Sequence, residues 1–423
     1  MDNLFTKFKL ALKDGSLRRR ILFVAVILGV FRLMSTIPIP GVDKVALEQF
    51  FASNQFLGLL NIFSGGGLSN LSIVMLGVGP YITASIIMQL LTMMFPKLKE
   101  MYHEEGEAGR KKFAQYSRLL MVPLAFIQGY SFLIILQRQG IIVDLPFLYL
   151  TANVAVIAAG SIFLVWLGEL MSEFGIGSGT SLIIFAGIVS RLPQGVSQMV
   201  YSLSRSDIPL YIAFLAAAIA TVAAVVTVTE AERPVPVTYA KRVRGSKVVG
   251  GISTYLPLRL NQAGVIPIIF ALSILLFPQM IVQFLARIDN ATISSISTFL
   301  TALLANTLFY GVAYFILVFL FTYFYTAVTF DPDSIAENLQ KSGAFVPGVR
   351  PGYHTAAYLG KIVTRITFVG ALFLGVIAVL PLAMKALTGI QALAIGGTAL
   401  LIVVSVVLDL IRKIEAQISM REY

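Results

Sequence analysis

The chain has 423 residues, of which 57% are hydrophobic and 13% are charged, whereas soluble domains carry about 25% charged residues. This composition excludes a water-soluble globular protein. The net charge is +11, and cysteine is absent, which excludes disulfides and thiolate metal sites.

Uncharged apolar stretches of about twenty residues recur along the chain, and each is long enough to cross a bilayer as an α-helix. The stretches are continuous and lack the alternation of a transmembrane barrel, so we expect an all-α polytopic membrane protein. Ten spans are predicted, at residues 21–37, 73–95, 119–137, 152–171, 181–201, 209–229, 263–285, 307–329, 364–384 and 392–411.

Basic residues are distributed unevenly between the two sides of these spans. Of the 32 Lys and Arg residues, 25 fall in the N-terminal segment, in the connections 97–118, 230–262 and 331–363 with Arg365 just after the last, and in the C-terminal tail. The positive-inside rule therefore places both termini in the cytoplasm. The three connections are expected to be inner loops, none long enough to form a soluble domain. The sequence after the first span, Ile37–Gly41, lacks a cleavage pattern, so we expect this span to be retained.

One apolar segment, Phe56–Phe63, is too short to cross the membrane and runs directly into Ser64–Gly67. It fits a re-entrant element beside a water-filled cavity. It fits an amphipathic helix on the outer surface equally well.

Catalytic and metal-binding motifs are missing. The phosphate-binding pattern G-x-x-x-x-G-K is absent, so no ATP hydrolysis is expected. The glycine-rich run Gly175–Gly179 does not follow a strand, so we interpret it as a tight loop between spans four and five. His103 and His354 are isolated, and we expect neither a metal nor a cofactor. No carboxylate or histidine lies midway along a span, which argues against a proton-coupled transporter.

Two groups of polar residues have two interpretations each. Thr83, Ser85 and Gln89 in the second span, with Asn261 and Gln262 opening the seventh, fit hydrogen bonds between helices or a helix boundary that can part. The basic run Lys241–Lys247 would contact RNA phosphates or acidic lipid headgroups.

Specific motifs occur in order from end to end of the chain: Ile37–Gly41, Asn61–Ser69, Pro80–Ile87, Glu105–Lys112, Trp166–Glu169, Gly175–Gly179, Tyr239–Arg242, Asn261–Pro267 and Lys341–Gly352. In these motifs the chain closely resembles the SecY family, the channel subunits of the bacterial protein translocase. The resemblance implies ten transmembrane helices in two pseudo-symmetric inverted halves, 1–205 and 206–423. The halves would surround an hourglass pore, with a short re-entrant plug helix at about 56–72.

The resemblance also implies functional residues. The plug would include Leu60, Ile62, Phe63, Ser64, Gly65, Gly66 and Gly67. The pore ring would comprise Val78, Ile82, Thr180, Ile184, Ile269 and Ile402. Thr180 stands where the family usually has an aliphatic residue, and its hydroxyl would weaken the seal or bond a backbone carbonyl one turn back. Ordinary packing is the alternative for these positions, since β-branched aliphatic residues are common in any span, but the resemblance favours the ring.

Helices two, three, seven and eight would form a lateral gate containing Ser85, Gln89 and Asn261. The SecA motor ATPase or the ribosome, including its rRNA, would dock on Lys241, Arg242, Arg244, Lys247 and Arg350. SecE and SecG would be partner subunits.

The expected function is a non-enzymatic protein-conducting channel of the bacterial inner membrane. It would pass unfolded secretory polypeptides and release transmembrane segments into lipid, so its ligands would be signal sequences and nascent chains. The alternatives are a small-solute secondary transporter and a polytopic membrane enzyme.

Overall fold

Long α-helices make up most of the chain in the structure, a computed structural model. It describes residues 15–40, 67–68, 70–138, 140–142, 146–190, 193, 197, 208–239, 242–244, 247–249, 253–285, 295, 297–300, 302–303, 306–388 and 396–419. The long helices are α2 (Gly15–Met34), α5 (Gly79–Met94), α7 (Gly106–Arg138), α8 (Phe147–Phe174), α9 (Gly179–Val189), α11 (Ile208–Glu230), α12 (Ile266–Leu285), α14 (Thr307–Thr329), α16 (Tyr353–Thr388) and α17 (Gly396–Ser419). The shorter elements are α6 (Pro96–His103), α15 (Pro332–Lys341), β1 (Glu232–Tyr239), β2 (Arg242–Arg244), β3 (Lys247–Val249), β4 (Ser253–Arg259) and β5 (Ala344–Phe345).

Every predicted span overlaps one of the long helices, and the all-α membrane architecture is confirmed. Within the described residues, four helices are long and apolar enough to cross a membrane by length and composition alone. A fifth qualifies if the bent pair α5–α6 is a single span. The count of ten crossings therefore stays a prediction.

The second span begins later than predicted. Residues 70–78 form turns, one of which carries a bridge between Pro38 and Ser72, and α5 begins at Gly79. At the other end of α5, the chain bends by 116° into α6. Pro96 occupies the first turn of α6. A backbone N–H at that position would have no acceptor within the helix, so proline costs no hydrogen bond there.

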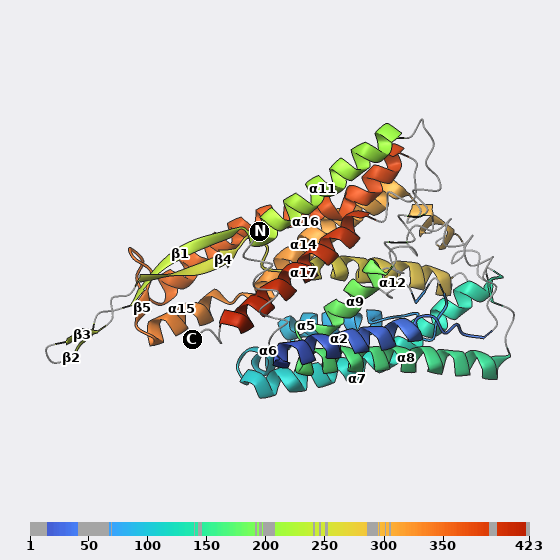
Figure 1. The fold of residues 1–423 in the computed structure, drawn as a ribbon, viewed down its shortest axis with the longest axis horizontal. Coiled ribbons are helices and arrows are strands. Elements are labelled where there is room, and N and C mark those ends of the chain that lie inside the picture. Colours follow the sequence, from blue (N-terminus) through green and yellow to red (C-terminus); the bar gives the residue numbers. More distant parts are fainter. Residues whose placement is uncertain are drawn as a thin grey trace.

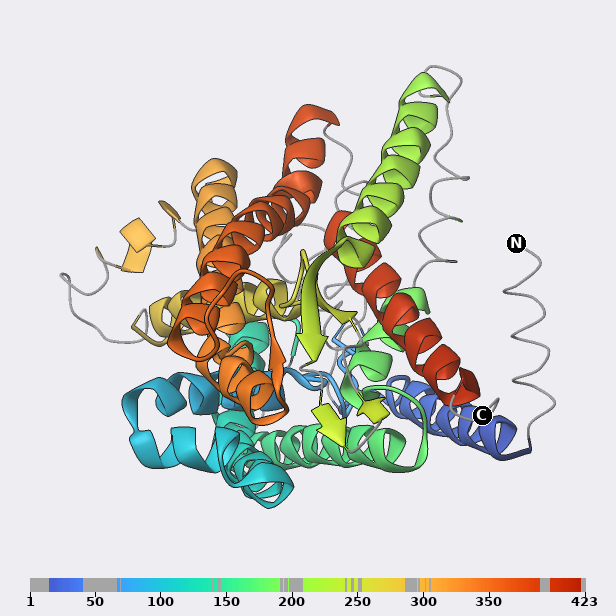
Figure 2. The ribbon, with the colours of Figure 1, turned by 90° about the vertical axis from the view of Figure 1, so that its left-hand side faces the viewer.

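The helices form two layers that meet at an angle (Figure 1). One layer contains α2, α5, α7 and α8, and the other contains α11, α14, α16 and α17. In Figures 1 and 2, α9 and α12 lie between the layers. One hydrophobic cluster joins the layers, because it includes buried side chains of α2, α8, α9, α12 and α17.

The inner connections are more ordered than the loops we expected. The connection 97–118 contains α6 and the first turns of α7. The connections 230–262 and 331–363 meet in one antiparallel sheet, ordered β4-β1-β5. Val235, Val237 and Leu258 pack there against Ala344 and Leu359. The two proposed docking segments therefore form one structural unit, which projects from one end of the helices (Figure 1).

Candidate functional site

Five of the six predicted pore-ring residues meet in the cluster between the layers. Val78, Ile184, Ile269 and Ile402 are buried, with exposed fractions of 0%, 3%, 9% and 1%, and the half-buried Ile82 packs against the same cluster. They come from α5 and its N-cap, α9, α12 and α17. The structure thus brings together positions more than 300 residues apart in the chain.

The backbone places Val78 and Ile82 one turn apart. The Ile82 N–H donates to the Val78 carbonyl at 3.1 Å, so Val78 is already part of the first helical turn. Gly77 has φ +58° and turns the chain into α5, a conformation that glycine adopts without strain. Because residues four apart share a helix face, both side chains point into the cluster. Aliphatic side chains offer water no hydrogen bonds, so a constriction built from them resists wetting.

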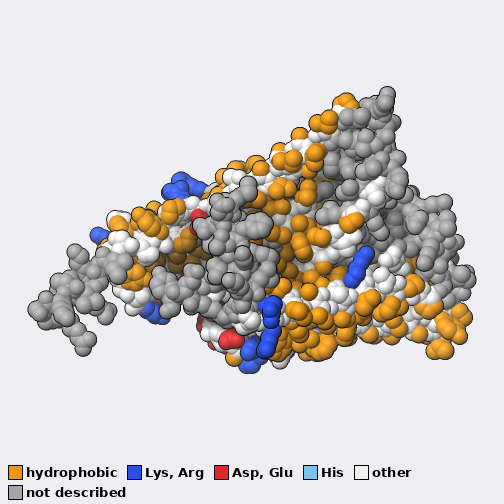
Figure 3. Space-filling view, in the orientation of Figure 1, with side chains coloured by type: hydrophobic (Ala, Val, Ile, Leu, Met, Phe, Trp, Pro, Cys, Tyr) orange, Lys and Arg blue, Asp and Glu red, His pale blue; other side chains and the backbone are white. Residues whose placement is uncertain are grey.

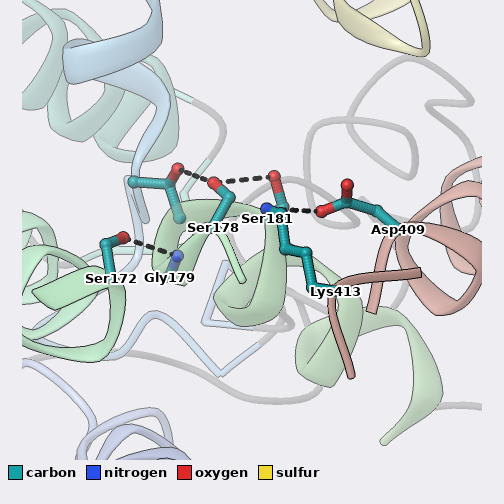
Figure 4. Close-up of polar contacts among 7 residues, drawn as sticks. Ser172, Ser178, Gly179, Ser181, Asp409 and Lys413 are labelled. Carbon is teal, nitrogen blue, oxygen red and sulfur yellow. Dashed lines mark hydrogen bonds and ion pairs between the residues drawn. The ribbon is translucent and has the colours of Figure 1, made fainter. Parts of the chain in front are cut away.

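Thr180 lies at the start of α9, and its hydroxyl contacts a neighbouring side chain; its effect on the seal stays a prediction. Its Oγ1 is 3.2 Å from Ser178 Oγ, within hydrogen-bond distance. Ser178 Oγ also accepts a bond from Ser181 Oγ at 3.1 Å, as Figure 4 shows. The Thr180 methyl group faces α8, since a Cβ built on Gly168 would lie 3.3 Å from it. The hydroxyl therefore has a local partner in the turn before α9.

The glycine-rich run Gly175–Gly179 is a tight turn between α8 and α9, as predicted. Gly177 has φ +91°. Gly179 lies so close to α8 that a Cβ on it would collide with the Gly168 carbonyl. Ser172 fixes this approach, because its Oγ accepts from the Gly179 N–H at 2.8 Å (Figure 4) and donates to the Gly168 carbonyl at 3.0 Å. The turn thereby sets the position of α9, which carries Ile184.

Two of the three predicted gate residues, Ser85 and Gln89, lie on α5, and the third, Asn261, lies in the turn that leads into α12. Ile86 of α5 shares a buried cluster with Ile268 and Leu272 of α12, so the two helices pack directly together. Gln89 Oε1 and Asn261 Oδ1 are buried and have no hydrogen-bond partner among the described residues.

Other polar groups near this seam bond within their own segment. The Asn261 amide donates to the Gly264 carbonyl at 3.2 Å. Ser85 hydrogen-bonds Tyr81 on the same helix. Thr83 donates to the Gly79 carbonyl at 3.1 Å. None of these bonds joins α5 to α12.

Arg350 is exposed on a fixed turn between β5 and α16. Gly348 and Gly352 have φ of +82° and +89°. The Thr355 hydroxyl donates to the Arg350 carbonyl at 2.9 Å and holds the turn onto α16. Arg350 makes no ion pair within the described part of the chain.

The other predicted docking residues lie at the far tip of the β1–β4 extension. Arg242 and Arg244 are in β2 and Lys247 is in β3, which pair with each other; Lys241 lies outside the described residues. In Figure 3, most visible Lys and Arg side chains lie toward the end of the molecule that carries the sheet, and hydrophobic side chains cover much of the rest.

The predicted plug lies almost entirely outside the described residues. Leu60, Ile62, Phe63, Ser64, Gly65 and Gly66 are not described. Gly67 is, and its carbonyl accepts from the Ser72 N–H at 2.9 Å in the turns before α5. The assignment of the plug stays a prediction. For metals, no group of three or more His, Asp or Glu side chains in the described residues could hold an ion.

Comparisons with known proteins place the whole chain in one family. The SecY family model matches residues 72–411. The protein translocase subunit SecY of Mycobacterium tuberculosis (strain ATCC 25618 / H37Rv) is 40% identical over 443 residues, covering 99% of each chain. That of Thermus thermophilus is 42% identical over 432 residues, covering 98% of this chain and 95% of the relative.

Solved structures share the fold. A structure described as that of a protein conducting channel has a TM-score of 0.65 at 21% identity, and covers 93% of this chain and 91% of its own. Sec61 in the canine ribosome-channel complex has a TM-score of 0.61 at 20% identity, with the same coverage. None of these comparisons supports a small-solute transporter. The chain therefore belongs to the SecY family.

Proposed function

We propose that this chain is a passive, gated channel through which unfolded polypeptides cross the bacterial inner membrane. The observation that carries the proposal is the meeting of five aliphatic side chains, from four separate helix regions, in one cluster between the two helix layers. Such a constriction has to deform around a passing chain and exclude ions when empty. Uncharged, branched side chains meet both demands, because they resist wetting and form no directional bonds that must break.

The seam between α5 and α12 is proposed as the lateral gate. Buried oxygens without partners are costly, at about 1–3 kcal/mol each. Gln89 on α5 and Asn261, just before α12, each carry one such oxygen. When the helices part, water or a polar group of the substrate reaches these oxygens, so part of the cost of opening is recovered. Signal sequences and membrane anchors would leave toward lipid by this route.

Both termini are proposed to face the cytoplasm. Leu17 at the start of α2, Ile176 in the α8–α9 turn and Ile414 near the end of α17 pack in one cluster. These three points therefore lie at one end of the molecule, the end that carries the sheet (Figure 1). Basic residues concentrate in the segments at this end, as the positive-inside rule requires of the cytoplasmic side.

The sheet and the Arg350 turn are proposed as the docking platform for the SecA motor ATPase and the ribosome, including rRNA phosphates. SecE and SecG are proposed as partner subunits, and residues 1–205 and 206–423 as inverted halves. Residues of about 56–72 are proposed as the plug. The channel supplies no chemical energy, so the motor, the translating ribosome or the proton motive force has to drive transport.

Reconstitution tests the function. The chain, purified with its partner subunits, is placed in liposomes with the motor ATPase and an unfolded secretory polypeptide. We expect the polypeptide to become protease-protected only when ATP is present. Uptake of a small solute by the chain alone, without polypeptide protection, would favour a transporter instead.

A further inference from the structure

The carboxyl end of α11 leads directly into the hairpin formed by β1 and β4, the docking hairpin. A cation from another helix contacts the last carbonyls of α11. β1 begins at Glu232, two residues after α11 ends at Glu230. The last carbonyls of a helix have no intrahelical partner and attract cations. Helix α11 has no basic residue in its last turn. Instead, Arg412 of α17 donates from Nη2 to the Thr229 carbonyl at 3.2 Å.

The other strand of the hairpin is fixed at the same level. The Leu260 N–H, just after β4, donates to the Ala231 carbonyl at 2.8 Å, which closes the base of the hairpin. Gly370 of α16 lies against this point, because a Cβ on it would come within 2.7 Å of the Leu260 carbonyl oxygen. The base of the hairpin is thus held between α16 and α17.

Both sides of this base lead to the pore cluster, the cluster between the helix layers that holds Val78, Ile82, Ile184, Ile269 and Ile402. On one side the chain runs from Leu260 into α12, which carries Ile269. On the other, Arg412 sits on α17 ten residues after Ile402, a distance of about 15 Å at the helical rise. A shift of the hairpin base therefore reaches two of the helices that form the constriction, one through the backbone and one through the Arg412 bond.

We propose that Arg412 is a positioning residue that couples the docking hairpin to the pore cluster. The proposal rests on the proposed channel function. Without the Arg412 bond, a partner still binds the hairpin, but movement of the hairpin reaches only α12. Binding and transport should then separate.

The neighbouring residue provides a matched control. Lys413 pairs with Asp409 at 2.8 Å, one turn back on the same helix, as Figure 4 shows. Arg412→Gln and Lys413→Gln each remove one positive charge at adjacent positions of α17, but only the first removes the bond to α11.

Motor-driven translocation into liposomes is measured over a range of motor concentrations. For Arg412→Gln we expect an unchanged half-saturating motor concentration and a maximal rate lower by roughly fivefold, the smaller end of typical coupling between sites. Lys413→Gln should match the unsubstituted protein, and Arg412→Lys, which keeps the cation, should fall between. An unchanged maximal rate in Arg412→Gln overturns the proposal. So does an equal loss in Lys413→Gln.

A structural readout separates coupling from a general loss of stability. The natural chain has no cysteine, so spin labels can be placed uniquely at Tyr255 on β4 and Val407 on α17, both exposed. Arg412→Gln should broaden the distance distribution between these labels, and Lys413→Gln should not. If Arg412→Gln yields no folded complex, Arg412→Lys carries both measurements, and an unchanged rate and distance in it overturn the proposal. Failure of the unsubstituted protein to translocate would count against the channel function instead.

Discussion

Ile82 and Ile402 face the pore cluster, while Leu90 and Val407 on the same two helices face outward. Ile402 is 1% exposed, whereas Leu90 and Val407 are 36% and 37% exposed. We expect Ile82→Ser and Ile402→Ser to raise the resting ion conductance severalfold, because a hydroxyl in the constriction favours wetting. Leu90→Ser and Val407→Ser should leave it unchanged. Single-channel recording measures the conductance of each variant. Equal ion leakage from the cluster-facing and the outward-facing variants would contradict the assignment of the pore ring.

Gly179 permits the closest helix approach near the site, between α8 and α9. Gly179→Ala places a methyl group on the Gly168 carbonyl, so we expect a loss of about 1–3 kcal/mol in stability. Thermal unfolding of the purified complex measures it. Gly29→Ala is the control, because nothing lies within 4 Å of its Cβ position and alanine is the better helix former. A similar melting temperature for both variants would contradict this role of Gly179.

Arg350 presents an exposed cation on a turn fixed by the Thr355 hydroxyl. Arg350→Glu reverses this charge without burying it, so the chain should fold and insert normally. We expect motor-driven translocation to fall at least tenfold, since the partner then meets a like charge. Lys361→Glu, an exposed cation on α16, is the comparison. A normal translocation rate in Arg350→Glu would remove this residue from the docking surface.

At the level of single residues, the sequence predicted which residues form the pore ring better than it predicted what each of them contacts. The pore-ring positions followed from the motifs around Pro80 and Asn261, and the structure places five of the six together. The partner of Thr180 could not be predicted. It depends on Ser178 lying beside it across a turn whose shape follows from the approach of Gly179 to Gly168, and that approach is a property of the packed helices.

At the scale of elements, hydropathy located the helices, but the sheet was missed. Val235 and Val237 alternate with exposed positions, as in a half-buried strand. Pro234 and Pro236 fill two of those exposed positions, and proline argues against a central strand. The structure tolerates both because β5 pairs only with Thr238 and Tyr239. Along its prolines, β1 therefore has a partner on one side only, and it behaves there as an edge strand.

This sheet gives a prediction about the docking platform. Val237 is 2% exposed and lies in the cluster with Leu258 and Leu359. Val237→Asp buries a carboxylate without a partner, which costs at least about 2 kcal/mol, so we expect the hairpin to detach from α16. Trypsin should then cleave after Arg259 faster than in the unsubstituted protein. Tyr255→Asp, at a position 67% exposed on β4, should not accelerate cleavage. Equal cleavage in the two variants would show that the cluster does not hold the hairpin.

At the scale of the whole molecule, the two helix layers differ from the seam between them in how they are packed. Within one layer, Gly375 of α16 lies against the Phe315 ring of α14, where a Cβ would approach within 2.7 Å. Helices α14 and α16 contact each other extensively, whereas α5 and α12 touch over a short stretch around Ile86 and Ile268. The sequence could not reveal this difference, because it gives the residues of each helix but not their neighbours. Opening should therefore occur at the seam, with the layers moving as units.

Spin labels on this cysteine-free chain test that expectation. One pair spans the seam, at Leu90 of α5 and Leu320 of α14. The other pair lies within one layer, at Leu320 and Leu372 of α16, and all three positions are exposed. Binding of a polypeptide with a signal sequence should lengthen the first distance by several ångströms, about the width of an extended chain. The second distance should stay constant, because α14 and α16 are packed too closely to slide. Equal changes in both pairs would mean that the layers deform throughout, and the seam would then not be the gate.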